Sequence, residues 1–272
     1  MKRLSLPLMT AVGLMGMPAL TACGSGSTDS ATSASAAMTP SASSTPSPSS
    51  TLSGTVTVLA AASLTESFTA LEKSFEAANP GVDVTISFGS SATLAQQIAQ
   101  GAPADLYASA GTKALDQLPA EAKAKPTTTL AKNVLEIATP PGNPKKVTGL
   151  ASLADASTNV VLCAETVPCG SAADAVLTKA AVTAHVVSRE VDVKATLAKI
   201  TLGEADAAIV YHSDVVAAGS KVEGVEIPAA QNTTLAYPLV RLTDTAATKA
   251  FADLLASAAG LKELEAVGFL AP

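Results

Sequence analysis

Short apolar segments rich in β-branched residues alternate with amphipathic helical segments along this chain, and this alternation limits the fold more than any other feature. Residues 55–60 (Thr-Val-Thr-Val-Leu-Ala) predict a buried strand. Large apolar side chains then recur at helical spacing from Leu64 to Phe75, and Asn79-Pro80-Gly81 is typical of a helix end. Strands that alternate with helices predict an α/β fold with parallel sheets covered on both faces.

The same alternation continues to the end of the chain and gives about 220 residues of folded protein, enough for two modest α/β lobes. Leu94 and Ile98 indicate a helix that stops at Gly101-Ala-Pro103. The other expected strands are 82–88, 105–109, 134–139, 159–163 and 207–211, and the other expected helices are 172–179, 193–202 and 246–266.

Composition excludes several classes of protein. The 272 residues are 48% hydrophobic and 15% charged, so the chain has ample apolar material for a core and cannot be disordered throughout. The net charge of −6 argues against a nucleic-acid partner, which needs a basic face. With no Trp, three Tyr and five Phe, the chain offers few aromatic platforms for stacking sugars or bases.

The N-terminus has the layout of a secretory signal. Lys2 and Arg3 precede an apolar stretch over 4–20, and Leu20-Thr-Ala-Cys23 follows. This ending resembles a bacterial lipobox, which implies a signal peptide over residues 1–22, cleavage before Cys23, and lipid on its thiol. The protein is then expected on the extracytoplasmic face of the cell membrane. A transmembrane anchor is the weaker alternative, because prolines and glycines interrupt a run that is short for a span.

Residues 23–53 predict a disordered tether behind the lipidated cysteine. The segment is almost entirely Ser, Thr, Ala, Gly and Pro, with Asp29 as its one charge, so it cannot bury enough apolar area to offset its ordering entropy. Removal of 1–22 takes away two basic residues and leaves 15 basic against 23 acidic residues, a formal charge of −8.

Cys163 and Cys169 remain as an even pair in an oxidising compartment, and this favours a disulfide that closes a small loop around Pro168. Two free thiols and a metal site are the alternatives. The metal site is the weaker of these, because no histidine or further cysteine lies nearby in the sequence to complete tetrahedral coordination.

Hydroxyl groups and helix starts recur where predicted strands end. Ser63 follows one strand, Ser90 and Ser91 follow the next, and Pro168-Cys169-Gly170 and Val193 open later helices. Free backbone N–H groups at such turns suit a small anion without any fixed cation. The alternative is that the serines are ordinary helix N-caps.

Signatures of an enzyme are missing from the sequence. There is no Gly-x-Ser-x-Gly elbow, Walker A loop, His-Glu-x-x-His or dinucleotide-binding Gly-x-Gly-x-x-Gly turn. A hydrolase with Ser63 or Ser91 as nucleophile would need a histidine base, and neither His185 nor His212 sits in a motif that supplies one. We therefore expect a protein that is not an enzyme. A surface adhesin or purely structural lipoprotein is a further alternative.

Five segments together resemble the periplasmic molybdate-binding proteins (ModA type) of ABC importers, over about residues 54–272. These segments are 58–68, 88–98, 100–110, 167–170 and 208–214. The resemblance implies a type II periplasmic binding protein, with two α/β lobes joined by two crossovers around a ligand cleft. Lobe one would take residues 54–133 plus 230–272, and lobe two residues 134–229. The implied partners are the importer's permease and ATPase, the implied state is a monomer, and no cofactor is implied.

The resemblance also implies an oxyanion site. Ser63 and Ser91 would each give a hydroxyl and a backbone N–H, Cys169 and Val193 would give backbone N–H groups, and Tyr211 its phenol hydroxyl. Val193 is assigned only by its spacing from Tyr211, and Cys169 replaces an expected alanine. The implied ligand is molybdate, with tungstate as a second, so molybdenum enters only as the oxyanion and has no direct protein ligand. Sulfate or phosphate is the alternative ligand.

Overall fold

Strand β1 (Gly54–Ala61) forms where the β-branched run at residues 55–60 predicts it. It belongs to a computed structural model that describes residues 52–272, all of which lie within one compact unit. The predicted signal peptide over residues 1–22, the lipid site at Cys23 and nearly all of the tether over residues 23–53 lie outside these described residues. None of the helices in the described part is both long and apolar enough to cross a membrane.

The first half of the sheet is parallel, as the alternation predicts. β1 lies between β2 (Val82–Gly89) and β3 (Leu106–Ala108) and pairs in parallel with both. The intervening helices are the 3-10 helix η1 (Ala62–Leu64), α1 (Thr65–Ala78) and α2 (Ser91–Ala99).

The second half repeats this arrangement. β5 (Val160–Cys163) lies between β6 (Val186–Glu190) and β7 (Ala207–Tyr211) and pairs in parallel with both. β6 was not predicted from the sequence. The helices that follow these strands are α4 (Pro168–Lys179), α5 (Val193–Thr201) and α6 (His212–Ala218). The remaining short helices are η2 (Lys113–Gln117), α3 (Ala120–Lys123), η3 (Leu150–Ala154) and η4 (Gly219–Lys221).

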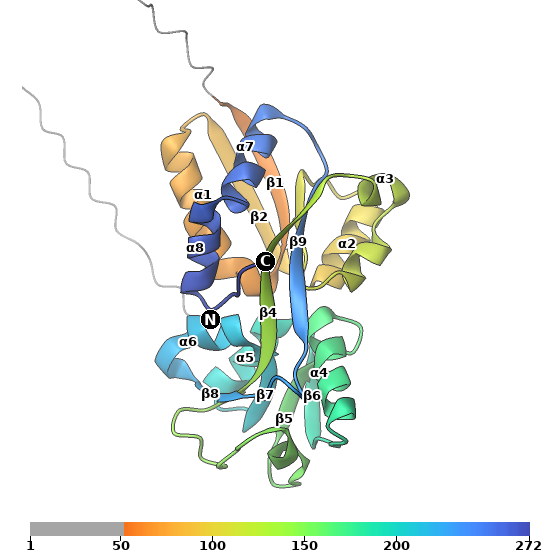
Figure 1. The fold of residues 1–272 in the computed structure, drawn as a ribbon, viewed down its shortest axis with the longest axis vertical. Coiled ribbons are helices and arrows are strands. Elements are labelled where there is room, and N and C mark those ends of the chain that lie inside the picture. Colours follow the sequence, from red (N-terminus) through yellow and green to blue (C-terminus); the bar gives the residue numbers. More distant parts are fainter. Residues whose placement is uncertain (1–51) are drawn as a thin grey trace, which may run out of the picture. The chain divides into compact units, whose positions relative to one another are not determined.

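The expectation of purely parallel sheets is wrong at the strands that join the two halves. β4 (Thr127–Thr139) runs antiparallel to β9 (Thr234–Arg241) through its first half and antiparallel to β7 through its second. β9 is also antiparallel to β3, and β8 (Glu223–Glu226) pairs with β4. The full order is β2-β1-β3-β9-β4-β7-β5-β6, and Figure 1 shows the long β4 and β9 running between the halves.

Helices cover both faces of the first half of the sheet. Val58 faces a core that includes Phe68 of α1 and Phe251, whereas its neighbour Leu59 faces a second cluster with Leu94 of α2. Figure 1 shows α1 and α2 on opposite sides of these strands. Strand residues alternate between faces, so each strand contributes to two apolar layers.

The single helix expected over residues 246–266 is instead two helices, α7 (Ala246–Leu255) and α8 (Ala258–Ala266). Ser257 starts α8, because its side chain accepts a hydrogen bond from the N–H of Gly260. Gly260 also allows a tight turn, since a Cβ there would clash with the backbone oxygens of Leu254 and Leu255.

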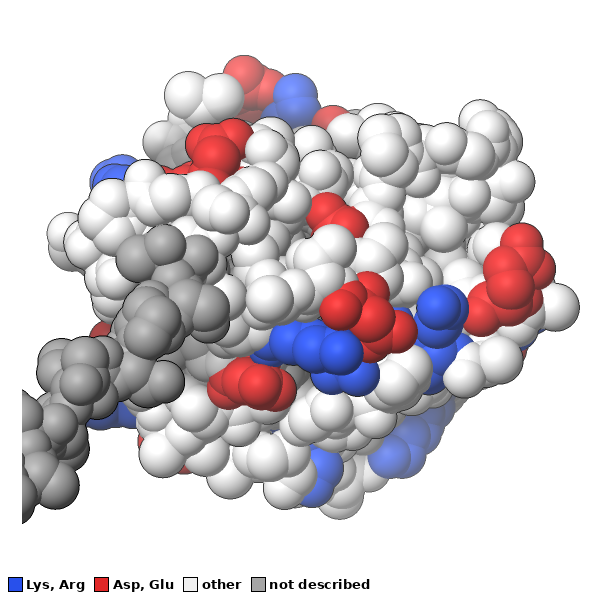
Figure 2. All heavy atoms as spheres, turned by 90° about the horizontal axis from the view of Figure 1, so that it is seen from above, with Lys and Arg blue, Asp and Glu red and all other residues white. Residues whose placement is uncertain are grey.

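Charged side chains are sparse and of mixed sign on the surface. On the face shown in Figure 2, acidic and basic groups are interspersed among uncharged residues, with no broad basic patch.

Candidate functional site

Two sets of three parallel strands, β1 to β3 and β5 to β7, run in opposite directions, and their carboxyl ends face each other across one small cavity. Its lining residues come from the turns directly after β1, β2, β3, β5 and β6 and from the end of β7. The cavity volume is about 20 Å³, far below the ~300 to 1,000 Å³ that is typical of pockets for drug-sized ligands. α/β sheets bind ligands outside the carboxyl ends of their parallel strands. The lining residues are Ala61, Ala62, Ser63, Gly89, Ser90, Ser91, Ala110, Pro168, Cys169, Asp192, Val193 and Tyr211.

The structure brings all five predicted ligand residues into this cavity lining. Ser63 and Ser91 come from the first half of the sheet, and Cys169, Val193 and Tyr211 come from the second. Their side chains are nearly or fully buried. Their contact with an oxyanion stays a prediction, but residues as far apart in the sequence as Ser63 and Tyr211 share one site.

Neither predicted serine acts as a helix N-cap, which was the alternative role for these hydroxyls. Ser63 lies within η1, and Ser91 is the first residue of α2, whose N-cap is Ser90. The Oγ of Ser91 accepts a hydrogen bond from the N–H of Ala110 at 2.9 Å. The Ser91 oxygen therefore already accepts a hydrogen bond from the backbone, and the hydroxyl proton of Ser91 is available to a ligand.

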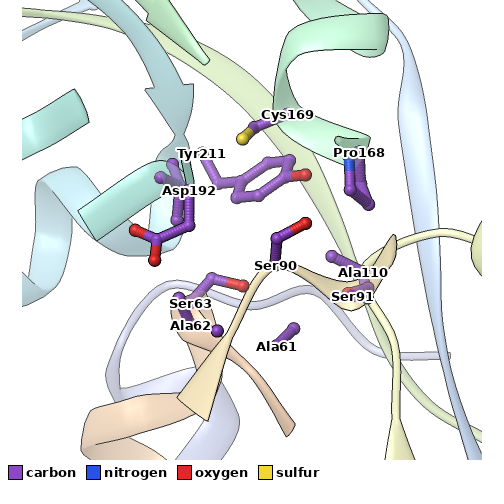
Figure 3. Close-up of a pocket in the computed structure, with 12 residues that line it drawn as sticks. Ala61, Ala62, Ser63, Ser90, Ser91, Ala110, Pro168, Cys169, Asp192 and Tyr211 are labelled. Carbon is purple, nitrogen blue, oxygen red and sulfur yellow. Dashed lines mark hydrogen bonds between the residues drawn. The ribbon is translucent and has the colours of Figure 1, made fainter. Parts of the chain in front are cut away.

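Two further hydroxyls in the cavity are buried without a hydrogen-bond partner among the described residues. They are the phenol of Tyr211 and the Oγ of Ser90. Figure 3 shows the Tyr211 ring on one side of the cavity and the hydroxyls of Ser63 and Ser90 on the other. Burial raises the pKa of Tyr211 well above its usual value, and the nearby Tyr237 and Asp214 raise it further, so the phenol keeps its proton. A buried unpaired donor is costly, and a bound acceptor would remove that cost.

Backbone donors surround the same space, because α2, α4 and α5 all begin at it. The first N–H groups of a helix have no partner within the helix, and its N-terminus carries partial positive charge. No lysine or arginine is among the lining residues that the structure describes. The cavity therefore offers an anion neutral donors and helix dipoles.

Cys163 and Cys169 form a disulfide at the base of α4, with their Cα atoms 5.8 Å apart. Both cysteines are buried, and Cys169 is also part of the cavity lining. The next residue, Gly170, has no room for a side chain, since a Cβ there would meet the carbonyl oxygens of Cys163 and Ala164. The disulfide and this close approach together fix the turn that presents the N–H of Cys169.

Charged groups in and beside the cavity have partners within the protein. Asp192 caps α5 by accepting the N–H of Ala195, and Figure 3 shows its carboxylate turned away from the Tyr211 phenol. Lys194 lies 3.2 Å from the buried carboxylate of Asp214 and 2.8 Å from Glu66. These pairs leave the cavity lining itself dominated by uncharged donors.

The two histidines lie away from the serines of the cavity. His212 Nδ1 is 2.6 Å from the carboxylate of Glu136, and His185 Nδ1 is 3.3 Å from the carbonyl of Thr158. Neither lines the cavity in the described part of the chain, so a serine hydrolase would lack its base there. Across residues 52–272 no cluster of three or more His, Cys, Asp or Glu could hold a metal ion.

Sequence reasoning missed the residues behind Ser63. The Oγ of Ser63 lies 2.9 Å from the phenol oxygen of Tyr237, which is in β9, a strand that was not predicted.

Known proteins resemble this chain over nearly all of the described residues. The molybdate-binding protein ModA of Mycobacterium tuberculosis is 36% identical over 265 residues, 96% of each chain. YvgL of Bacillus subtilis, whose name describes a candidate ABC transporter substrate-binding lipoprotein, is 30% identical and covers 80% of this chain and 86% of its own. The molybdate-binding protein of Azotobacter vinelandii shares the fold, with a TM-score of 0.68 at 21% identity over 80% of this chain and 99% of its own.

The likeness of fold confirms the predicted architecture of a periplasmic binding protein. A family model described as bacterial extracellular solute-binding protein matches residues 56–270. That range contains both halves of the sheet and every residue of the cavity. This chain belongs to the bacterial extracellular solute-binding proteins.

Proposed function

We propose that this protein captures molybdate in the cavity at the ends of the six strands and delivers it to an ABC importer. The observation that carries the proposal is the chemistry of the lining. Two serine hydroxyls, a buried phenol without a partner and several helix N-termini converge on a space with no lysine or arginine among the described lining residues. The names of the M. tuberculosis and A. vinelandii relatives support molybdate as the anion.

The net charge of the protein does not oppose this function. A dianion in the cavity is surrounded at hydrogen-bond distance by neutral donors and helix N-termini, and charge-assisted hydrogen bonds strengthen where water is excluded. The nearby carboxylates of Asp214 and Glu66 share Lys194 as a partner, and the carboxylate of Asp192 accepts the N–H of Ala195. Local donors therefore outweigh a distant formal charge that salt screens within about 10 Å.

Tungstate is proposed as a second ligand, because it shares the charge and tetrahedral shape of molybdate. Sulfate has the same charge and shape but shorter bonds, so discrimination against it would rest on the size of the cavity. Calorimetric titration of the purified full chain with molybdate, tungstate, sulfate and phosphate tests this proposal. We expect tight binding of molybdate and tungstate and weak binding of sulfate and phosphate. A preference for sulfate or phosphate would show that the protein is a receptor for that oxyanion instead.

We further propose that Cys23 carries lipid and holds the protein on the extracytoplasmic face of the membrane. The basic start, apolar stretch and Leu-Thr-Ala-Cys ending support this, as does the word lipoprotein in the name of the B. subtilis relative. Delivery then takes place at the permease and ATPase of the importer, with the binding protein acting as a monomer. Metabolic labelling with a fatty acid should mark the wild type, and Cys23→Ser should abolish the label and release the protein.

A further inference from the structure

A buried tyrosine outside the cavity lies directly behind one of its serines. The phenol oxygen of Tyr237 is 2.9 Å from the Oγ of Ser63, although 174 positions separate the two residues. Tyr237 is fully buried and does not line the cavity. Its ring is fixed by edge-on contacts with Tyr211 and Phe269, whose ring centres are 6.1 and 4.9 Å away. The contact with Ser63 is therefore held by packing on two sides.

The neighbours of Tyr237 determine which of the two oxygens donates. The side-chain amide of Asn133 is oriented by the N–H of Val134, which donates to its Oδ1 at 3.0 Å. Its Nδ2 donates to Ser213 at 2.7 Å and faces the Tyr237 oxygen at 3.5 Å. An amide nitrogen has only donors, so it cannot accept the phenol proton. Among the described residues, the hydrogen-bond acceptor within reach of that proton is the Oγ of Ser63.

Burial also keeps the proton on Tyr237. It raises the pKa of Tyr237 well above the ordinary value of a phenol, against the opposing hydrogen bonds of Ser63 and Asn133. If Ser63 donated to Tyr237 instead, the phenol proton would be buried without an acceptor, which is the costlier arrangement. The favoured direction is therefore from Asn133 to Tyr237, and from Tyr237 to Ser63.

We propose that Tyr237 is a positioning residue that donates its proton to Ser63 and so leaves the proton of Ser63 for the oxyanion in the cavity. Ser91 provides a parallel, since the backbone N–H of Ala110 occupies its oxygen in the same way. One serine is thus held as a donor by the backbone, and the other by a side chain from β9. This inference rests on the proposed function and adds a residue that does not touch the ligand.

The test is a double-mutant cycle on the purified full chain, with molybdate affinity measured by calorimetry. Tyr237→Phe keeps the packed ring and removes only the hydroxyl, and it should lower affinity about tenfold. Ser63→Ala removes the group through which Tyr237 acts. If Tyr237 works through Ser63, the double variant should bind as Ser63→Ala does, because a phenol with no serine to orient has no further effect.

Tyr107→Phe is the matched control. Tyr107 is also a fully buried tyrosine, but its phenol donates to the backbone carbonyl of Ser91 at 2.7 Å and has no contact with Ser63. Combined with Ser63→Ala, this control should give additive effects, whereas Tyr237→Phe should not. Provided that the wild type binds molybdate, two results would overturn the inference. One is an affinity loss in the double variant that equals the sum of the losses from Tyr237→Phe and Ser63→Ala, and the other is unchanged affinity in Tyr237→Phe. A wild type that binds neither molybdate nor tungstate would overturn the proposed function, and the inference with it.

Discussion

The carboxylate oxygens of Glu66 in α1 both lie 2.8 Å from the ammonium group of Lys194 in α5. α1 follows a strand in the first half of the sheet, and α5 follows a strand in the second half. Lys194 also pairs with the buried Asp214 at 3.2 Å. Any separation of the two halves must therefore break the ion pair between Glu66 and Lys194, whereas the pair between Lys194 and Asp214 lies within one half.

We predict that Glu66→Gln weakens ligand binding through faster release. The ion pair stabilises only the state in which the two halves meet, so its loss favours opening of the cleft. Glu66 is 42% exposed, and exposed pairs contribute at most about 1 kcal/mol, which corresponds to a loss of affinity of up to about fivefold. Stopped-flow measurement of the dissociation rate checks this. Glu72→Gln on the same helix is the control, and an equal effect of both variants would argue against a role for the pair.

The free energy of unfolding should depend on pH through the titration of Asp214. Burial raises its pKa from 3.8 to about 6, although Lys194 and the N–H of Tyr211 act to lower it. Burial alone would lower the pKa of Lys194, but the carboxylates of Asp214 and Glu66 raise it overall, so Lys194 stays charged over this range. The folded state thus holds the Asp214 proton more tightly than the unfolded chain does. This contribution to stability is full below about pH 4 and is lost as the pH rises through about 6.

Asp214→Asn removes the titration and leaves a side chain of similar size. The free energy of unfolding of this variant, relative to wild type, should therefore rise between pH 4 and pH 7. Urea unfolding at several pH values measures that difference. A difference that stays constant over the range would show that Asp214 titrates at its ordinary pKa.

Local patterns were sufficient to predict the elements that carry the site. The β-branched run before Ser63, the helical spacing of Leu64 and Phe68, and the apolar run that ends at Tyr211 each form the expected strand or helix. Because these elements are consecutive α/β units, the polar residues after the strands of each half gather at the carboxyl edge of that half, and the two edges face each other across the cavity. The five residues of the predicted oxyanion site reach one cavity for this reason.

The missed features depend on contacts between distant parts of the chain. β9 contains Pro238, and proline within a run argues against a strand, but here it pairs with β4 next to an irregularity in the register. Asn133 was not assigned to a strand, because a polar side chain at a fully buried position is explained only by its partners Ser213 and Tyr237. No periodicity within either segment reveals these partners.

The predicted lobe boundary between residues 133 and 134 falls inside the continuous strand β4. β4 changes partner there, from β9 at Val134 to β7 at Leu135. The division into two lobes, over residues 54–133 plus 230–272 and over residues 134–229, remains a prediction, and it implies that the lobes move relative to each other when the ligand binds. It would be tested by comparing scattering curves with and without molybdate.

Tyr211→Phe should lower affinity for molybdate without destabilising the ligand-free protein. The Tyr211 phenol is buried and lacks a hydrogen-bond partner among the described residues, so its removal costs the empty fold nothing. In the complex it would be a donor to a dianion, and loss of such a bond costs about 1 to 3 kcal/mol, or about 5- to 150-fold in affinity. Calorimetry and thermal unfolding of the same sample measure both quantities. Unchanged affinity would remove Tyr211 from the set of ligands.

Ser90→Ala should lower affinity for molybdate by about 5- to 150-fold, because it too would remove one hydrogen bond to a dianion. Ser90 is 8% exposed, its Oγ has no partner among the described residues, and its side chain does not cap α2. The Ser90 hydroxyl therefore makes no hydrogen bond within the described residues that would explain why it is buried at the cavity. Ser87→Ala, at an exposed position of β2, the strand that precedes Ser90, is the matched control. Equal affinity of both variants and wild type would show that Ser90 does not contact the anion.

The disulfide should stabilise the fold and the binding turn together. Cys163 and Cys169 are six residues apart, and closing so short a loop is worth about 2 kcal/mol in the chain-entropy description. Cys163→Ala combined with Cys169→Ala should lower the free energy of unfolding by about that amount and also weaken molybdate binding, because the turn that presents the Cys169 N–H becomes less constrained. Urea unfolding and calorimetry measure the two effects, and wild type treated with a reductant should approach the double variant. Two titratable thiols in the folded, exported wild type would contradict the disulfide. Unchanged molybdate affinity in the double variant would show that the disulfide stabilises the fold but is not needed for binding.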